Sequence, residues 1–191
     1  MSESGDVLER FLSRGQSYGL PDVAVSRIET HCSEVFLVGN QAYKLKRPIA
    51  FSSLDYRTLA QREAACRAEL ALNRRTAPEL YLGLHAIRRR ADGTLRLDGE
   101  GTIVDWVVAM RRFDQADLFD RLAETGKLTS LLARALAEEI ARCHGEAERT
   151  PRYGGASGLR DAIEQNHADL LTVSAILGQD KIDRLYSAGL R

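Results

Sequence analysis

The chain has 191 residues, of which 44% are hydrophobic and 28% charged, and this composition is typical of a globular protein rather than a disordered one. Lysine plus arginine and aspartate plus glutamate both total 27, so the formal net charge is zero and no overall positive field would draw the protein to nucleic acid. The acidic N-terminus has no apolar signal region and no apolar run approaches the roughly 18–20 residues of a membrane span, so we expect no export and no membrane contact.

The N-terminal part of the chain has the pattern of one short helix followed by strands. Apolar residues at helical spacing predict a helix over residues 6–14, which the glycines and proline at 15–21 end. Alternating apolar residues then predict three antiparallel strands between Val23 and about Lys46, with Gly39-Asn40 as the turn between the last two.

A second helix and more strands complete this part. The helix is predicted from Thr58 to about Arg75, with Leu59, Cys66 and Leu70 on one face and four largely solvated arginines, Arg62, Arg67, Arg74 and Arg75. Strand patterns follow from residue 80 to Met110, interrupted by a turn at 91–94. We therefore expect an α+β fold in which an antiparallel sheet of about five strands surrounds one helix.

After Phe113 the predicted elements are all helices. The periodic segments are 118–123, 131–148, 159–177 and 181–186, with a glycine-rich loop at 151–158. The predicted division is a sheet lobe with an N-terminal helix over residues 1–113 and a helical part over 114–191.

Three cysteines, Cys32, Cys66 and Cys143, form no C-x-x-C pair and have no metal-type spacing with the four histidines. A chain of this size does not need disulfides for stability, so reduced thiols and a cytoplasmic location fit best. The cysteine pattern predicts no metal site.

The third predicted strand carries Ala42-Tyr43-Lys44, followed by Lys46. Side chains alternate along a strand, so Ala42, Lys44 and Lys46 share one face. Enzymes with a protein-kinase-like fold present A-x-K on the third strand, where the small residue leaves room for adenine and the lysine meets the phosphates. On this interpretation Lys44 faces a nucleotide and Lys46 lies near the mouth of the cleft; the alternative is two lysines that protect an exposed edge strand.

A phosphate-facing lysine needs a carboxylate from the following helix, and Glu63 and Glu69 are the candidates. At 100° per residue, Glu63 lies within the apolar stripe of the helix, whereas Glu69 falls about 80° to one side. Either glutamate could instead pair with a neighbouring arginine on the helix surface.

The turn Thr30-His31-Cys32-Ser33 joins the first two strands, where kinases carry a glycine-rich loop. It contains no glycine, so a phosphate contact there would come from backbone N–H groups or from the hydroxyls of Thr30 and Ser33. His31 could equally be an ordinary exposed turn residue.

Several longer blocks resemble a known family. They are E-T-H-C-S-E-V-F-L-V-G-N-Q-A-Y-K-L-K-R-P, L-D-Y-R-T-L, C-R-A-E-L-A-L-N-R-R-T-A-P-E-L-Y-L-G-L, V-D-W-V-V-A-M-R-R-F and I-A-R-C-H-G-E-A-E. Together, over roughly residues 20–165, they are similar to bacterial aminoglycoside-phosphotransferase-like proteins in which a kinase-like domain precedes a P-loop ATP-binding domain.

This resemblance implies roles for individual residues. Lys44 would be the phosphate lysine, and Glu69 is favoured over Glu63 as its partner. The segment from Met110 to Phe113 would be the hinge whose backbone meets the adenine edge; Met110 could also simply end a core strand. The implied ligand is ATP, with Mg²⁺ in the intact protein, and the acceptor is a small molecule that the sequence does not specify.

The chain departs from the family where catalysis would occur. Such enzymes have a catalytic loop of the type H-G-D-x-H-x-x-N, and no such segment is present. His167-Ala168-Asp169 lies in a helical pattern with Ser174 where asparagine is required, so we interpret it as a chance match. We therefore assign no catalytic residue and no metal ligand, and expect a truncated front half that exposes apolar surface and self-associates through its helices.

Two other functions remain open at this point. A non-catalytic, pseudokinase-like module would bind a partner domain through its cleft or through the helix that carries Leu132 and Leu136. A nucleic-acid binder is less favoured, because its candidate arginines flank strands without interleaved aromatic residues and a solvated face explains them: Arg88, Arg89, Arg90, Arg111 and Arg112.

Overall fold

The structure is a computed structural model that describes residues 3–51, 53–150 and 154–190. The chain forms two compact units, residues 1–145 and residues 146–191. This division lies later in the chain than the predicted lobe boundary, although the last strand ends at Arg111, close to that boundary.

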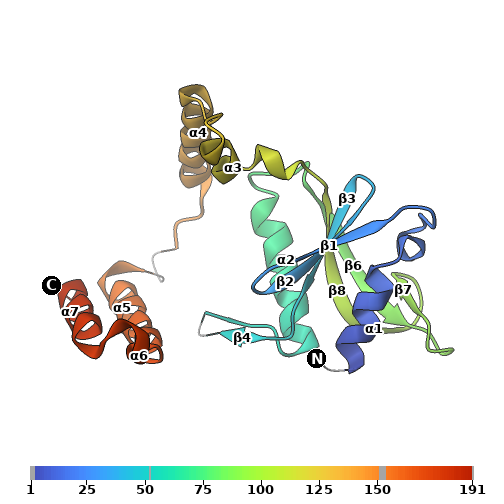
Figure 1. Cartoon of the computed structure of the whole chain (residues 1–191), viewed down its shortest axis with the longest axis horizontal. Helices are drawn as coiled ribbons and strands as arrows, with labels where there is room; N and C mark the ends of the chain where they lie inside the picture. The colour runs from blue at the N-terminus through green and yellow to red at the C-terminus, as the bar shows by residue number, and fades with distance from the viewer. Residues whose placement is uncertain (1–2, 52, 151–153, 191) are drawn as a thin grey trace. The chain divides into compact units, whose positions relative to one another are not determined.

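The first unit contains a six-stranded antiparallel sheet (Figure 1). Its strands run in the order β1-β2-β3-β8-β6-β7, so β3 lies between two partners. Their bounds are Val25–Glu29 for β1, Ser33–Val38 for β2, Gln41–Lys46 for β3, Tyr81–Arg89 for β6, Leu95–Leu97 for β7 and Thr102–Arg111 for β8.

The α+β class and the antiparallel sheet are confirmed, but the predicted number of strands was too low. The short return segment, β7, pairs with β6 and adds a sixth strand. A separate two-stranded hairpin of β4 (Ala50–Phe51) and β5 (Leu54–Asp55) was not predicted. These strands are too short for an alternating pattern to reveal them.

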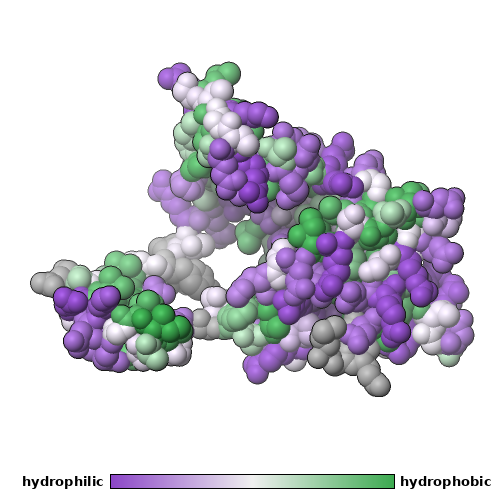
Figure 2. Space-filling view, in the orientation of Figure 1, coloured by the Kyte–Doolittle hydropathy of each residue, from purple (hydrophilic) through white to green (hydrophobic). Residues whose placement is uncertain are grey.

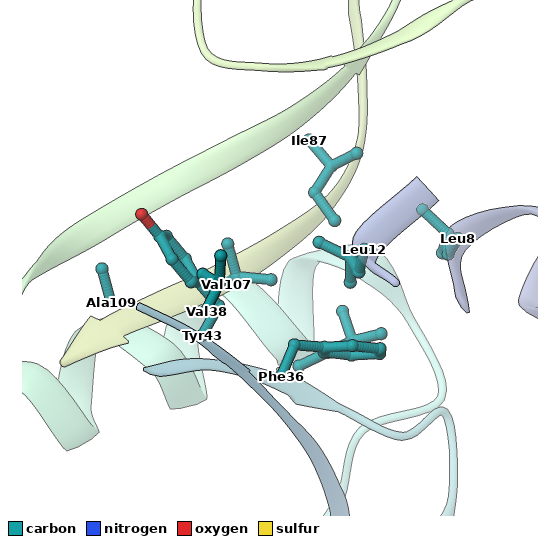
Figure 3. Close-up of a cluster of buried hydrophobic side chains, with 9 residues drawn as sticks. Leu8, Leu12, Phe36, Val38, Tyr43, Ile87, Val107 and Ala109 are labelled. Atoms are coloured by element: carbon teal, nitrogen blue, oxygen red, sulfur yellow. The ribbon is translucent and has the colours of Figure 1, made fainter. Parts of the chain in front are cut away.

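One face of the sheet is covered by helix α1, Glu3–Leu12, and the 3-10 turn η1, Gly15–Tyr18. Figure 3 shows Leu8 and Leu12 of α1 pointing into a cluster that includes Phe36 and Val107 of the sheet. Gly15 permits η1 to lie close against the backbone that follows it, because a Cβ there would lie 2.1 Å from the carbonyl oxygen of Leu20. Tyr43 and Leu45 of β3 also belong to this cluster.

Helix α2, Leu59–Asn73, covers the opposite face (Figure 1). Its start is fixed by a capping box in which Thr58 accepts from the backbone N–H of Gln61, and the Gln61 side chain accepts from that of Thr58. Such a cap contributes about 1 kcal/mol. Cys66 of α2 then packs against Trp106 and Val108 of β8.

The prediction that Arg62 is solvated was wrong. Its side chain is buried and Nε donates to Oδ1 of Asp105 on β8 at 2.9 Å, while Nη1 donates to the carbonyl oxygen of Tyr56 at 3.0 Å. The charge is tolerated inside the fold because a carboxylate and backbone carbonyls surround it. The ion pair joins α2 to β8, and the hydrogen bond to Tyr56 joins α2 to the loop that precedes it.

The chain after Phe113 is helical, as predicted. In the first unit it forms η2 (Gln115–Asp117), α3 (Phe119–Glu124) and α4 (Ser130–Glu146), and in the second unit α5 (Gly155–Leu171), α6 (Ser174–Leu177) and α7 (Gln179–Gly189). The predicted loop over 151–158 is shorter, because α5 begins at Gly155; residues 151–153 lie outside the described residues. Of the described helices, none has the length and apolar character that crossing a membrane requires.

The H-x-D segment lies within α5 of the second unit. His167 stacks on Tyr186 of α7, with ring centroids 4.1 Å apart, and its Nε2 lies 3.3 Å from Oδ1 of Asp183. These contacts give His167 a structural role in packing α5 against α7.

Candidate functional site

Lys44 lies on a central strand and not on an edge. Lys44 is paired with Val35 of β2 and with Val108 of β8, and Ala42 is paired with Met110. The alternative in which the lysines protect an exposed edge strand is therefore wrong. Ala42, Lys44 and Lys46 occupy the face of β3 that α2 covers.

Both lysines contact one carboxylate. Nζ of Lys44 lies 2.8 Å from Oε1 of Glu69, and Nζ of Lys46 lies 2.6 Å from Oε2 of the same residue. The side chains are 28% exposed for Lys44, 5% for Lys46 and 11% for Glu69. Of the three side chains, that of Lys44 is the most exposed.

The electrostatics of this cluster favour the ionised forms. Burial by itself would raise the pKa of Glu69, but the hydrogen bonds from Lys44 and Lys46 outweigh it and hold that pKa below its ordinary value. Burial would likewise lower the pKa of Lys46, and the contact with Glu69 instead keeps it above its ordinary value. Two ammonium groups share one carboxylate, so the cluster keeps one net positive charge.

The prediction that Lys46 lies near the mouth of a cleft was wrong. Lys46 is buried, and its ammonium also lies 4.9 Å from the centroid of the Tyr56 ring, within cation–π range. Cys66 is nearby, and burial raises the pKa of its thiol to about 11, so this cysteine is a neutral packing residue.

Glu63 does not approach the lysines. Oε1 of Glu63 lies 2.7 Å from Nη2 of Arg67, one helical turn away on the surface. The helical wheel selected the wrong glutamate, because the apolar stripe of α2 faces β8 and β6, on which the helix packs, and not the lysines of β3. The lysines of β3 lie beside this stripe, where Glu69 projects.

The hydroxyls of the β1–β2 turn are engaged within the turn itself. Oγ1 of Thr30 donates to the carbonyl oxygen of Ser33 at 2.8 Å and accepts from its N–H at 3.1 Å, while Ser33 is fully buried. His31 stacks on Phe51 of the β4–β5 hairpin, with centroids 4.5 Å apart. These side chains build the turn, and their contact with a phosphate stays a prediction.

The predicted hinge lies at the other end of the same sheet face. Arg111 donates its backbone N–H to Leu80, and Arg112 donates its own to Asn40, so both amides are already bonded. A cavity of about 400 Å³ adjoins this segment; it is lined by Leu37, Asn40, Arg112, Phe113, Asp114 and Gln115. Leu37 is paired with Ala42, so one lining residue of the cavity shares the sheet face of Lys44.

Sequence reasoning missed the buried pair of Arg62 and Asp105. A signal was present, because Asp105 interrupts the otherwise apolar strand I-V-D-W-V-V-A-M. A carboxylate in such a strand requires a buried partner, and an arginine of the covering helix is the obvious source. Within residues 3–51, 53–150 and 154–190, no group of three or more His, Cys, Asp or Glu side chains is arranged to hold a metal ion.

Comparison with known proteins gives relatives without an assigned activity. The chain is 35% identical over 121 residues to the uncharacterized proteins Rv2004c of Mycobacterium tuberculosis and Mb2027c of Mycobacterium bovis. The match covers 63% of this chain but only 22% of the length of each relative. No family model matches the chain, and no solved structure matches it at a significant level.

Proposed function

We propose that the first unit is the ATP-binding portion of a kinase-like small-molecule phosphotransferase, of the aminoglycoside-phosphotransferase type that the sequence blocks resemble. The observation that carries this proposal is the contact of Lys44 on β3 with Glu69 on α2. In protein kinases, an ion pair between a lysine of the third strand and a glutamate of the following helix positions the lysine for phosphate.

The charge balance of the cluster supports the same role. Lys46 occupies one carboxylate oxygen of Glu69, so the carboxylate cannot fully neutralise Lys44. The Lys44 side chain is held in place yet remains 28% exposed. A fixed, partly exposed cation is suited to bind a phosphate group with little reorganisation.

The residues present fit a nucleotide in part. Lys44 would contact the phosphates, while Ala42 beside Met110 leaves space for the base next to the cavity at residues 112–115. When bound, ATP would supply the transferable phosphoryl group, and Mg²⁺ would accompany it in the intact protein. The match covers only 22% of the length of the curated relatives, and the proposal includes a longer protein whose further sequence carries the catalytic aspartate and asparagine and a P-loop ATP-binding domain.

Isothermal titration calorimetry of the 191-residue chain with Mg·ATP tests the proposal. We expect weak binding and no phosphoryl transfer, and Lys44→Met should weaken the binding at least about tenfold, equivalent to 1.4 kcal/mol. Lys127→Met is the matched control, because Lys127 is exposed and outside the cluster. Binding that Lys44→Met leaves unchanged would remove the basis for the proposal, and robust turnover by this chain would contradict its catalytic incompleteness.

A second candidate is a non-catalytic, pseudokinase-like binding module. It is favoured by the apolar side chains on α4, where Leu131 is 74% exposed and Leu136 and Ile140 are 43% and 46% exposed. Such a module would keep its partner when Lys44 is replaced by alanine and lose it when Leu132 and Leu136 are replaced by glutamate. The phosphotransferase proposal expects the opposite dependence for nucleotide binding.

A further inference from the structure

A groove of about 680 Å³ lies on the sheet face opposite Lys44, between α1, η1 and the β6–β7 hairpin. Its floor is apolar: Phe11 of α1 and Leu95 and Leu97 of β7 line it and pack against the buried core cluster beneath. The floor is therefore a fixed surface supported by the sheet.

The rim of this groove is strongly basic. Arg10, Arg14, Arg90 and Arg96 line it, and among the side chains that the structure describes no aspartate or glutamate does. Asp92 is nearby in the hairpin turn, where its Oδ1 accepts hydrogen bonds from the N–H and hydroxyl of Thr94. The groove thus concentrates positive charge in a chain whose formal net charge is zero.

The rim arginines also differ from others in the first unit. Arg27 contacts the carboxylates of Glu9 and Glu34, and Arg47 contacts that of Glu29. Across the described residues, none of the four rim arginines forms an ion pair with a carboxylate. The hydrogen bonds from Thr94 and, after them, the charge of Arg90 lower the pKa of the nearby Asp92 carboxyl, so the charges of Arg10, Arg14 and Arg96 are the most available to a partner.

We infer that this groove binds an extended, acidic peptide segment of a partner protein in which carboxylates alternate with apolar side chains. The carboxylates would meet the rim arginines, which favour bidentate contact with such groups, and the apolar side chains would cover Phe11, Leu95 and Leu97. β7 ends the strand order, so an extended segment can lie along its free side. Nucleic acid fits less well, because Phe11 is the one aromatic side chain among the described residues that line the groove, and it offers no series of stacking platforms.

A fluorescein-labelled peptide of eight residues, alternating glutamate and leucine, tests the inference by fluorescence anisotropy with the full chain. We expect saturable binding by the unaltered chain. In the double variant Arg14→Glu/Arg90→Glu, whose two positions are exposed, the affinity should fall at least about tenfold. Arg134→Glu with Arg160→Glu is the matched control, since it makes the same charge change at exposed positions outside the groove. Arg14→Gln with Arg90→Gln gives a second variant pair if charge reversal disturbs folding.

Control probes separate the two parts of the recognition. A peptide with glutamine in place of glutamate and a peptide of glutamate alone should both bind more weakly than the alternating peptide. Absence of saturable binding, equal binding of the glutamine peptide, or equal effects of the groove and control variants would overturn the inference. A single-stranded oligonucleotide that binds more tightly and displaces the peptide would assign the groove to nucleic acid instead.

Discussion

Lys46 and Glu69 form a buried ion pair across the interface of β3 and α2, with Nζ 2.6 Å from Oε2. Lys44 shares the same carboxylate from a more exposed position, at 2.8 Å from Oε1. The two lysines therefore differ in environment although they are two residues apart on one strand. Lys46 is the buried partner of the carboxylate, and Lys44 is its more exposed partner.

This difference predicts unequal effects on stability. Lys46→Met should lower the free energy of unfolding by about 1–3 kcal/mol, because breaking a buried pair is costly but Glu69 retains Lys44 as a partner. Lys44→Met should cost less, about 1 kcal/mol or below, because Lys44 is more exposed and its pair is better screened. Urea unfolding monitored by circular dichroism measures both, with Lys127→Met as the control. A larger loss for Lys44→Met would contradict these assignments.

Glu69 should also give the fold an acid-dependent stability. Its pKa is lowered in the folded state, so its contribution is fully present above its ordinary value of about 4.5 in the unfolded chain and is lost as pH falls toward the folded value. Glu69→Gln should therefore be less stable than the unaltered chain at pH 7, by about 3 kcal/mol, and the gap should narrow below about pH 4.5.

The matched control for this pH dependence is Glu63→Gln, which alters a partly exposed pair with Arg67 and should change stability by less than about 0.5 kcal/mol. Unfolding free energies of the three proteins between pH 3 and 7 test the sign. A gap between Glu69→Gln and the unaltered chain that stays constant over this range would show that Glu69 does not titrate as described.

The buried pair of Arg62 and Asp105 predicts strong coupling. Arg62→Met leaves the Asp105 carboxylate buried without its main partner, so we expect a loss of about 3–5 kcal/mol. Burial already raises the pKa of Asp105 despite the hydrogen bonds from Arg62, so the lost stability should be partly recovered at low pH, where Asp105 is protonated. Combining Arg62→Met with Asp105→Leu should restore most of the stability, and a double-mutant cycle in urea measures this coupling. Additive effects of the two single changes would exclude it.

The apolar side chains of α4 predict self-association of the isolated chain. Figure 2 shows hydrophobic surface among polar side chains on this helix. Leu136 and Ile140, one turn apart on α4, are both exposed. Leu136→Glu with Ile140→Glu should shift the chain toward monomer in sedimentation velocity experiments at increasing concentration. Ala137→Glu with Ala141→Glu adds the same charge about 100° around the helix and should shift it less. A chain that remains monomeric before any substitution would refute the prediction.

Local patterns in the sequence were enough to predict most of the helices and strands and the face on which each strand residue lies. Helical periodicity located α2 and the helices after Phe113, and alternation placed Ala42, Lys44 and Lys46 together on one face of β3, because these patterns depend only on backbone geometry. The choice of Ala42-Tyr43-Lys44 as a candidate site also came from the sequence, and the binding of a nucleotide there remains a proposal.

The folded arrangement was needed to establish which carboxylate meets the lysines, how deeply Lys46 is buried and which residue pairs with Arg62. These outcomes depend on the position of α2 over β8 and β6, which brings Glu69 beside β3 and Arg62 onto Asp105. A helical wheel ranks side chains by their angle to an apolar stripe, whereas long charged side chains reach partners beside that stripe. The packing of the helix on the sheet, and not its periodicity, therefore selected the charged groups of the candidate site.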